Sequence, residues 1–254
     1  MARNDSSRKR KKRSKMSGPS AGLIIAIVGT VVGFCFLGCL GLTIIGIPAA
    51  RHEARKTQSK MNLRQIGLAL YNYHDNYGMF PPGDVVREDG VSLGSWQARL
   101  LPYIDMAPLY RQISFEEGWE SAQNSAVYGE PIATYHNHGL PKPPAASISH
   151  YAGNIHTFPS NTGIRIYDIA DGASNTIVVG EVTHGLKHWG DPANLRDPAI
   201  GLGPTPGQFN GPWRDGGCQF LFADGAAIFI SNDIDPAVLE ALATPSGGEA
   251  VTEF

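Results

Sequence analysis

Cysteine is scarce in this chain, which contains only Cys35, Cys39 and Cys218 among its 254 residues. The first two lie within one apolar run, so Cys218 has no partner for a disulfide in the remaining sequence. A scaffold held together by disulfides is thereby excluded. We interpret Cys218 as a small apolar residue of a strand, which is the commoner use of a free cysteine.

The sequence also lacks several motifs of common catalytic sites. It has no phosphate-binding loop, no H-E-x-x-H pair and no G-x-G-x-x-G dinucleotide fingerprint. An isolated acid such as Glu181 could serve as a general acid, but nothing in the sequence pairs it with a second catalytic group. We therefore expect no catalytic residues and no enzymatic activity.

Charged residues are few, at 17% of the chain, and the net charge of -2 hides an asymmetry. Residues 1–20 hold eight of the 21 lysines and arginines but a single acid, Asp5. The rest of the chain carries 13 bases against 22 acids, a net charge of -9. Because an acidic surface repels phosphate backbones, we expect no nucleic-acid binding by the main domain.

A long run without any charged residue follows the basic segment, over residues 21–47. As a helix it would be about 40 Å long, enough to cross a hydrocarbon core of roughly 30 Å. A cleaved signal peptide is the rival interpretation, although its apolar region is usually only about 7–15 residues long. The sequence therefore predicts a retained transmembrane helix in contact with membrane lipid.

The basic segment predicts the orientation of that helix. Eight basic residues precede the apolar run, against four between Arg51 and Lys60, so the positive-inside rule places the N terminus in the cytoplasm. A nucleic-acid arm or a nuclear signal is an alternative use of such a segment, but topology and attraction to anionic lipid explain it more simply. We expect a cytoplasmic tail over 1–20 and an extracytoplasmic domain over 48–254, held at the cytoplasmic (inner) membrane.

The sequence after Pro48 predicts a long helix over 49–78, continuous with the apolar run. Apolar residues recur at spacings of three and four, which places them on one face of a helix: Leu63, Ile66, Leu70, Tyr73 and Tyr77. Three polar residues indicate a polar opposite face: Asn62, Gln65 and Asn72. Gly78 and the two prolines after it provide the C-terminal stop.

Short elements are predicted in the remaining sequence. Ser95 is a candidate N-cap of a short helix, and residues 131–159, rich in Pro, His, Asn and Ser, predict an irregular surface segment. Strands are expected at 163–169 and 175–182.

The last part of the chain predicts a hairpin and a helix. Asp224-Gly225 separates two apolar runs and indicates a hairpin over 218–231, whose two turn residues would both need positive φ. Asp235 and Pro236 predict the start of a C-terminal helix over 236–243. A long helix first and a small antiparallel sheet afterwards is an α+β fold.

Two groups of residues are candidate metal ligands. Asp168, Asp171 and Asn175 lie in a glycine turn and offer the hard oxygen ligands that calcium prefers, but they lack the alternating acidic pattern of a calcium loop. A turn leading into a strand is the simpler interpretation.

The second candidate set comprises Glu181, His184 and His188, which would share one face if the segment were helical. The neighbouring residues predict a strand, so loop histidines exposed to solvent are the simpler interpretation. His136 and His138 are weaker candidates still. We expect no firm cofactor or metal, with calcium as the remaining possibility.

Several segments, in this order along the chain, resemble the domain of unknown function 1559 family of pilin-like envelope proteins. They are "IPAARHEARKTQSKMNLRQIGLALYNYHDNYGMFPPG", "SWQARLLPYIDMAPLY", "HYAGN", "DGASNTIVVGE", "FLFADGAAIFI" and "ALATPSGGE". The resemblance implies a pilin or pseudopilin architecture, in which the second half of a long N-terminal helix packs on an antiparallel sheet. It extends over residues 48–254.

The chain departs from the family pattern at three places. The family's closing hairpin carries a histidine ten residues before the Asp-Gly pair; here Asp224 and Gly225 match, whereas Arg214 replaces the histidine. The apolar run lacks the glutamate that family members carry after the prepilin cleavage site, and a mid-domain Cys-Pro-Ser segment is absent. The resemblance therefore does not extend to processing or to assembly into a pseudopilus.

Together these features predict a non-catalytic, single-pass envelope protein with a structural or interaction role, whose partners would be envelope or secretion-system proteins. The alternative is an extracytoplasmic module that binds a solute or a polysaccharide. Four tryptophans could supply sugar-stacking faces, although aromatic core packing is their commoner use: Trp96, Trp119, Trp189 and Trp213.

Overall fold

The structure, a computed structural model, describes residues 20–143 and 145–248, with only some of the side chains between 21 and 46. Two compact units divide the chain, Met1–Arg51 and His52–Phe254. In the part that is described, no helix combines the length and apolarity needed to cross a membrane. The tail predicted over 1–20 lies outside the described residues except for its last one, and so do many side chains of the predicted span over 21–47.

The second unit is α+β. Its helices are the end of α1 (Ala21–Tyr77), α2 (Trp96–Leu100), α3 (Ala107–Tyr110), α4 (Ala122–Tyr128) and α5 (Pro236–Ala243). Its short 3₁₀ helices are η1 (Leu101–Tyr103), η2 (Ala133–Tyr135), η3 (Ile166–Asp168), η4 (Ala173–Asn175) and η5 (Pro198–Ile200). Its strands are β1 (Asp84–Val86), β2 (Ser92–Ser95), β3 (Ile148–Ser149), β4 (Tyr151–Asn154), β5 (Ile177–Glu181), β6 (Lys187–His188), β7 (Leu195–Arg196), β8 (Gly217–Phe222) and β9 (Ala227–Ser231).

The main sheet has five strands in the order β7-β4-β5-β8-β9. Its pairs are antiparallel except β4 with β7, which run parallel. A bulge in the β5–β8 pairing lies between Ile177 and Val179 and shifts the alternation of β5, so that Val179 and Glu181 both face α1. Two further pairs, β1 with β2 and β3 with β6, form separate small ladders.

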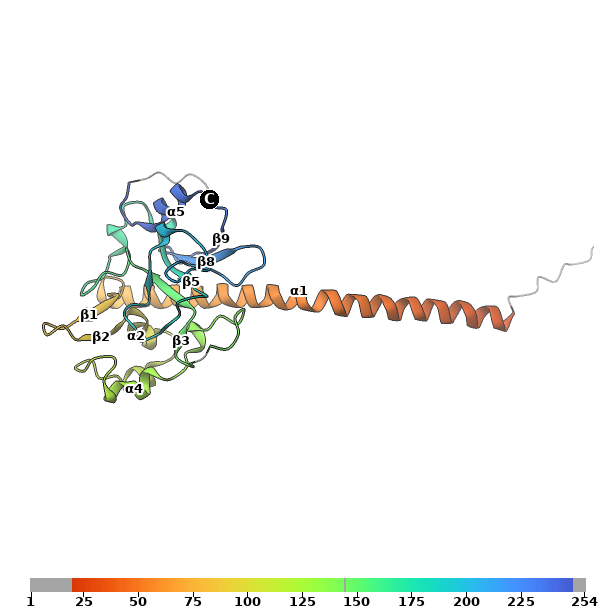
Figure 1. Cartoon of the computed structure of the whole chain (residues 1–254), viewed down its shortest axis with the longest axis horizontal. Coiled ribbons are helices and arrows are strands. Elements are labelled where there is room, and N and C mark those ends of the chain that lie inside the picture. Colours follow the sequence, from red (N-terminus) through yellow and green to blue (C-terminus); the bar gives the residue numbers. More distant parts are fainter. Residues whose placement is uncertain (1–19, 144, 249–254) are drawn as a thin grey trace, which may run out of the picture. The chain divides into compact units, whose positions relative to one another are not determined.

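The end of α1 lies between this sheet and the elements from β1 to β3 (Figure 1). On the sheet side, Gln219 of β8 donates to the carbonyl oxygen of Lys56. On the other side, Asn62 donates to the carbonyl oxygen of His136. The opposite face of the sheet is covered by α5, whose Leu239 and Leu242 pack in a second apolar cluster with Phe220. The sheet is therefore covered on both faces.

The apolar stripe of α1 is confirmed for most of its members, because Leu63, Ile66 and Leu70 are at most 1% exposed. The predicted polar face is wrong at Asn62, which is only 4% exposed, and Tyr77 is exposed rather than buried. Since the helix has protein on both sides, burial extends around most of its circumference. The helix ends as the sequence predicts, with Gly78 in the left-handed conformation at φ 74°.

Two other local predictions need correction. Residues 163–169, predicted as a strand, contain the 3₁₀ helix η3, because the backbone closes a local hydrogen bond from the N–H of Asp168 to the carbonyl oxygen of Arg165 instead of pairing with a strand. Residues 131–159, predicted as an irregular surface segment, contain β3 and the buried central strand β4. Small side chains at Ala152 and Gly153 explain the burial of β4, since Gly153 lies directly against Trp96 and Phe158.

The closing hairpin forms between β8 and β9, with Gly217 opposite Ser231. In its turn only Gly225 takes positive φ, at 86°, so the expectation of positive φ at Asp224 is wrong. The Asp224 carboxylate instead accepts from the amide N–H of Ala226 at 2.8 Å. The C-terminal helix α5 has the predicted bounds, and Asp235 caps it through the amide of Ala237 at 2.9 Å.

Candidate functional site

The most unusual chemical feature of the domain is the buried carboxylate of Glu181 at the end of β5. This side chain has no exposed surface and no cationic partner among the described residues. Burial raises the pKa of Glu181 to about 7, against the opposing effect of the hydrogen bonds that it accepts. A buried carboxylate without a cation is stable only if its oxygens are well hydrogen-bonded.

Four donors from separate parts of the chain converge on this carboxylate. They are Ser59 Oγ of α1 and Asn137 Nδ2 at 2.8 Å, both to Oε1, and Trp213 Nε1 at 2.6 Å and the backbone N–H of Gln219 at 2.8 Å, both to Oε2. These contacts join α1, the segment after η2, the loop before β8 and β8 itself to the end of β5. The carboxylate therefore fastens the long helix to the sheet.

The network continues from Ser59 to Tyr151 of β4 and to Asn62, one turn further along α1. Tyr151 Oη lies 2.8 Å from Ser59 Oγ, and Asn62 Nδ2 donates to the same phenol oxygen at 3.3 Å. When Glu181 is ionised, every donor in this series of hydrogen bonds has an acceptor. Asn62 donates to Tyr151, Tyr151 donates to Ser59, and Ser59 donates to Glu181. The hydrogen bonds order the core, and the four side chains are at most 4% exposed.

A hollow of about 250 Å³ lies beside this network, and its walls include His136, His138, His150 and Lys142. Asn137 connects the two features, because its side chain donates to Glu181 and its backbone N–H donates to His150 Nδ1 at 3.0 Å. Burial lowers the pKa of His150 to about 4, with smaller contributions from His136 and His138. His150 is therefore neutral at pH 7, and its Nδ1 atom is the acceptor.

These histidines do not form a metal site by their positions. Within residues 20–143 and 145–248, no group of three or more His, Cys, Asp or Glu side chains has a geometry that could hold a metal ion. The rings of His136 and His150 lie 5.7 Å apart, and His136 Nε2 is engaged with the carbonyl oxygen of Ala146 at 2.9 Å. The hollow offers hydrogen-bonding groups and the positive charge of Lys142.

The candidate calcium ligands have other partners in the structure. Asp168 is paired with Arg165 at 2.6 Å and 2.8 Å, and these hydrogen bonds lower the pKa of its carboxyl. The carboxylate of Asp171 accepts from the amides of Gly247 and Gly248, and Asn175 donates to the carbonyl oxygen of Asp171. These contacts fix the turn and the segment after α5.

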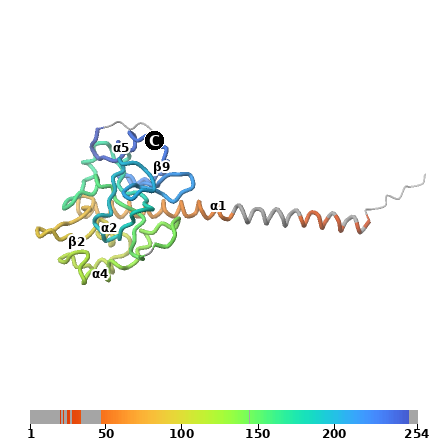
Figure 2. Tube along the Cα trace, viewed as in Figure 1, coloured from red at the N-terminus to blue at the C-terminus, as the bar shows by residue number. Residues whose placement is uncertain are grey.

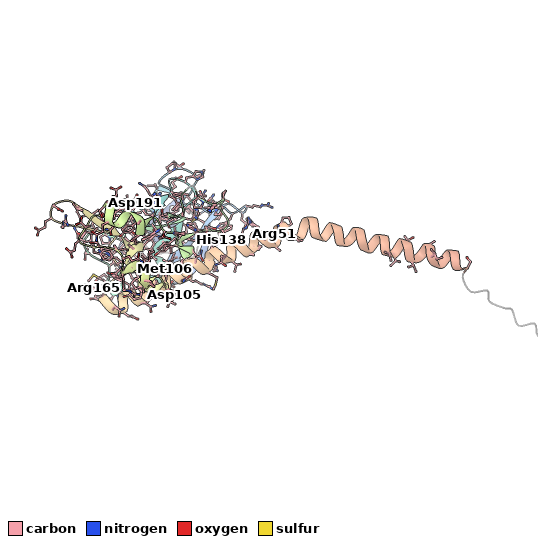
Figure 3. All side chains as sticks on the ribbon, turned by 90° about the horizontal axis from the view of Figure 1, so that it is seen from below. Arg51, Asp105, Met106, His138, Arg165 and Asp191 are labelled. Atoms are coloured by element: carbon pink, nitrogen blue, oxygen red, sulfur yellow. The ribbon has the colours of Figure 1, made fainter. Side chains whose placement is uncertain are left out.

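The other candidate metal set is divided between interior and surface. Glu181 is buried, whereas His184 and His188 are exposed and bond to Thr183 and Ser147 respectively. The hollow beside Glu181 and the calcium candidates are also far apart, because Figure 3 places His138 and Arg165 at different ends of the domain. The structure therefore assembles neither candidate set as a metal site, and of their members only Glu181 is linked to the histidine hollow, through Asn137.

The residues of the closing motif lie at the surface. Arg214 is exposed next to Trp213, and in the described part of the chain its side chain has no ion pair. Asp224 and Gly225 make the hairpin turn. Cys218 is free and buried within β8, as predicted, and burial raises its pKa.

Sequence reasoning missed the network around Glu181, because its six contributing segments extend from Ser59 of α1 to Gln219 of β8 and no motif links them. One signal was available: Ser59 and Asn62 lie among the apolar residues of α1, where small polar side chains often mark buried hydrogen bonds.

Comparison with known families gives one match. A family model described as a protein of unknown function (DUF1559) matches residues 48–141, which include the second half of α1 and the chain as far as the histidine hollow. Neither the curated proteins nor the solved structures that were compared match the chain.

Proposed function

The chain belongs to the DUF1559 family, and from this premise we propose that it is a non-catalytic, single-pass envelope protein that displays a pilin-like domain outside the cytoplasmic membrane. The observation that carries the proposal is the continuity of α1, which begins in the uncharged run and ends in the core of the second unit. A helix of this kind can serve both as an anchor and as the central element of the displayed domain.

The contacts of Glu181 support a structural role for the domain. Ser59 of α1, Trp213 and Gln219 all bond to one sealed carboxylate, so the helix is held on the sheet by hydrogen bonds as well as by apolar packing. Force or torque applied to a displayed domain would be transmitted through this attachment. The contacts therefore fit an envelope protein whose role is structural or interactive, with membrane lipid and envelope or secretion-system proteins as partners.

The orientation can be tested by labelling single engineered cysteines with a membrane-impermeant maleimide in spheroplasts. Tyr167→Cys introduces a thiol at a side chain that is 72% exposed in the domain. We expect Tyr167→Cys to react in intact spheroplasts and Ser6→Cys, in the basic tail, to react only after lysis. The parent chain controls for the native cysteines. Reaction of Tyr167→Cys only after lysis would contradict an extracytoplasmic domain.

A second candidate function is the binding of a polysaccharide or another solute by the displayed domain. The observation that favours it is a half-exposed tryptophan, Trp119, which borders two hollows of the surface. Binding would add an interaction to the displayed domain and leave its anchoring unchanged.

A further inference from the structure

Three of the four tryptophans are structural. They are at most 5% exposed: Trp96, Trp189 and Trp213. Each indole N–H has an acceptor inside the domain: Asn194 O at 3.5 Å for Trp96, Glu130 O at 2.8 Å for Trp189, and Glu181 Oε2 at 2.6 Å for Trp213. The sequence-based interpretation of core packing therefore holds for these three, and none of them can present a ring face to a ligand.

Trp119 differs from them in both respects. It is half-buried, and its indole N–H has no hydrogen-bond partner in the part of the chain that the structure describes. It is nevertheless held in place, because its backbone N–H donates to the carbonyl oxygen of Ser92 at 3.0 Å and its ring meets Tyr128 edge-on at 6.2 Å. The domain thus presents an ordered aromatic ring with a free donor.

Trp119 and Glu120 border two hollows of about 260 Å³ and 420 Å³. The first is bounded by α4 and β6 through Ser125 and His188, and the second by the turn of the β1–β2 hairpin through Gly90 and Val91. The hairpin and α4 lie on the same side of α1 (Figure 2). The second volume lies within the roughly 300–1,000 Å³ of small-molecule sites and the first lies just below it, so each hollow can hold a group the size of a sugar ring.

The polar groups around the two hollows are hydroxyls, an imidazole and carboxylates. Hydroxyls come from Ser92, Ser121 and Ser125, and a free imidazole nitrogen comes from His188, whose Nδ1 is bonded to Ser147 Oγ at 2.6 Å. The carboxylates of three exposed acids lie in the same segment: Glu116, Glu117 and Glu120.

Two of the nearby cations are paired with carboxylates, whereas Arg99, whose charge acts on Tyr128 of the first hollow, has no ion pair among the described residues. Arg87 is bound to Asp89 by three hydrogen bonds of 2.6 to 3.0 Å, and Lys187 lies 3.4 Å from Asp191. Because Glu116, Glu117 and Glu120 outnumber this unpaired cation, the net charge around the hollows is negative, which disfavours an anionic ligand.

We propose that Trp119 is the stacking platform of a glycan-binding groove, with one sugar ring in each of the two flanking hollows and an uncharged saccharide chain as the ligand. A sugar ring has an apolar C–H face that packs on indole and hydroxyls at its edge that bond to serine, carboxylate and imidazole groups. The inference rests on the second candidate function above and is independent of the membrane anchor.

To test the proposal, the full chain is titrated separately with cellohexaose, chitohexaose and a hexamer of galacturonate. Binding is measured by isothermal titration calorimetry and by tryptophan fluorescence. The chain is kept in a zwitterionic detergent, because the head groups of glucoside and maltoside detergents are sugars and would compete. We expect at least one of the two uncharged hexamers to bind and to change the indole emission, and the galacturonate hexamer to bind at least tenfold more weakly.

Two variants probe the groove by different means. Trp119→Ala removes the platform and should weaken binding at least tenfold. Ser125→Leu leaves the platform intact and fills the first hollow, and it should weaken binding by a similar factor. Their matched controls are Tyr167→Ala, an exposed aromatic elsewhere on the domain, and Ala126→Leu, the next residue of α4, which borders neither hollow. Both controls should bind as the parent chain does.

Folding and anchoring are checked separately by thermal melting and by membrane fractionation of each variant. A parent chain that binds neither uncharged hexamer would overturn the proposal, as would equal binding of the galacturonate hexamer. Unchanged affinity in both Trp119→Ala and Ser125→Leu would place the ligand elsewhere. Loss of glycan binding with an unchanged membrane fraction leaves the anchor proposal intact, so the two failures are distinguishable.

Discussion

At the residue scale, Ser59 is the link between the long helix and the buried acid. It is fully buried and lies between Glu181 and Tyr151, so both of these groups depend on its hydroxyl. We expect Ser59→Ala to lower the free energy of unfolding by about 2–3 kcal/mol, because a buried carboxylate oxygen and a buried phenol each lose a partner. Urea denaturation of the full chain measures the effect.

The matched control is Ser125→Ala on α4, whose exposed hydroxyl makes one local bond to the carbonyl oxygen of Ala122. Its expected cost is below about 0.5 kcal/mol. Equal costs for the two alanine variants would show that the network does not stabilise the domain.

The titrations of Glu181 and His150 make the free energy of unfolding depend on pH in opposite directions. Glu181 has a folded pKa of about 7, above its ordinary value of 4.5, so its contribution is present below pH 4.5 and is lost as the pH rises to 7. His150 has a folded pKa of about 4, below its ordinary value of 6.5, so its contribution is present above pH 6.5 and is lost as the pH falls to 4. The two slopes nearly cancel between pH 4.5 and 6.5.

If one of the two groups is removed, the free energy of unfolding should follow the pH dependence of the remaining group. In His150→Asn the amide oxygen can still accept from the backbone N–H of Asn137, but the side chain at position 150 no longer titrates. We expect the unfolding free energy of this variant to fall by about 3 kcal/mol between pH 4.5 and 7, since one pKa unit corresponds to about 1.4 kcal/mol. His184→Asn, at an exposed histidine, controls for the substitution, and an identical pH profile for both variants would contradict the account.

Single residues show where sequence reasoning reached its limit. Cys218 and the caps at Gly78 and Asp235 follow from local chemistry, and they were predictable. The role of Glu181 was not, because it depends on donors from α1, from the segment after η2 and from β8 that only the fold brings together. Asn62 was placed on a polar face because periodicity alone does not reveal that a helix is covered on both sides.

At the scale of elements, the packing of α1 distinguishes two leucines two positions apart. Leu70 is 1% exposed in the core, whereas Leu68 is 62% exposed. We expect Leu70→Ala to cost about 2–5 kcal/mol through lost burial and the cavity left behind, and Leu68→Ala less than about 1 kcal/mol. Chemical denaturation of the two variants makes the comparison, and equal losses would mean that this part of α1 does not pack as described.

Two elements were predicted correctly because short sequence motifs define their ends. Helix α5 has both an N-cap and a proline at its first position, and the β8–β9 hairpin has the Asp224-Gly225 turn. Strand β4 was missed because its residues are small or polar and its burial comes from neighbouring strands and Trp96. The segment at η3 was predicted as a strand, but a backbone hydrogen bond from Asp168 to Arg165 closes it into a turn.

At the scale of the whole molecule, we propose that one chain has two roles, as an anchor and as a displayed domain. The family match covers residues 48–141 and therefore the helix within the domain, while the uncharged run over 21–47 precedes it. That run carries no glutamate for assembly, so the chain should stay a fixed, unprocessed anchor instead of becoming a fibre subunit.

The intact mass of the native protein, purified from carbonate-washed membranes, tests this claim most directly. We predict that the protein stays in the membrane pellet and that its mass includes residues 21–47 together with the basic segment before them. Release into the carbonate supernatant, or a mature chain that begins near Ala50, would contradict the account.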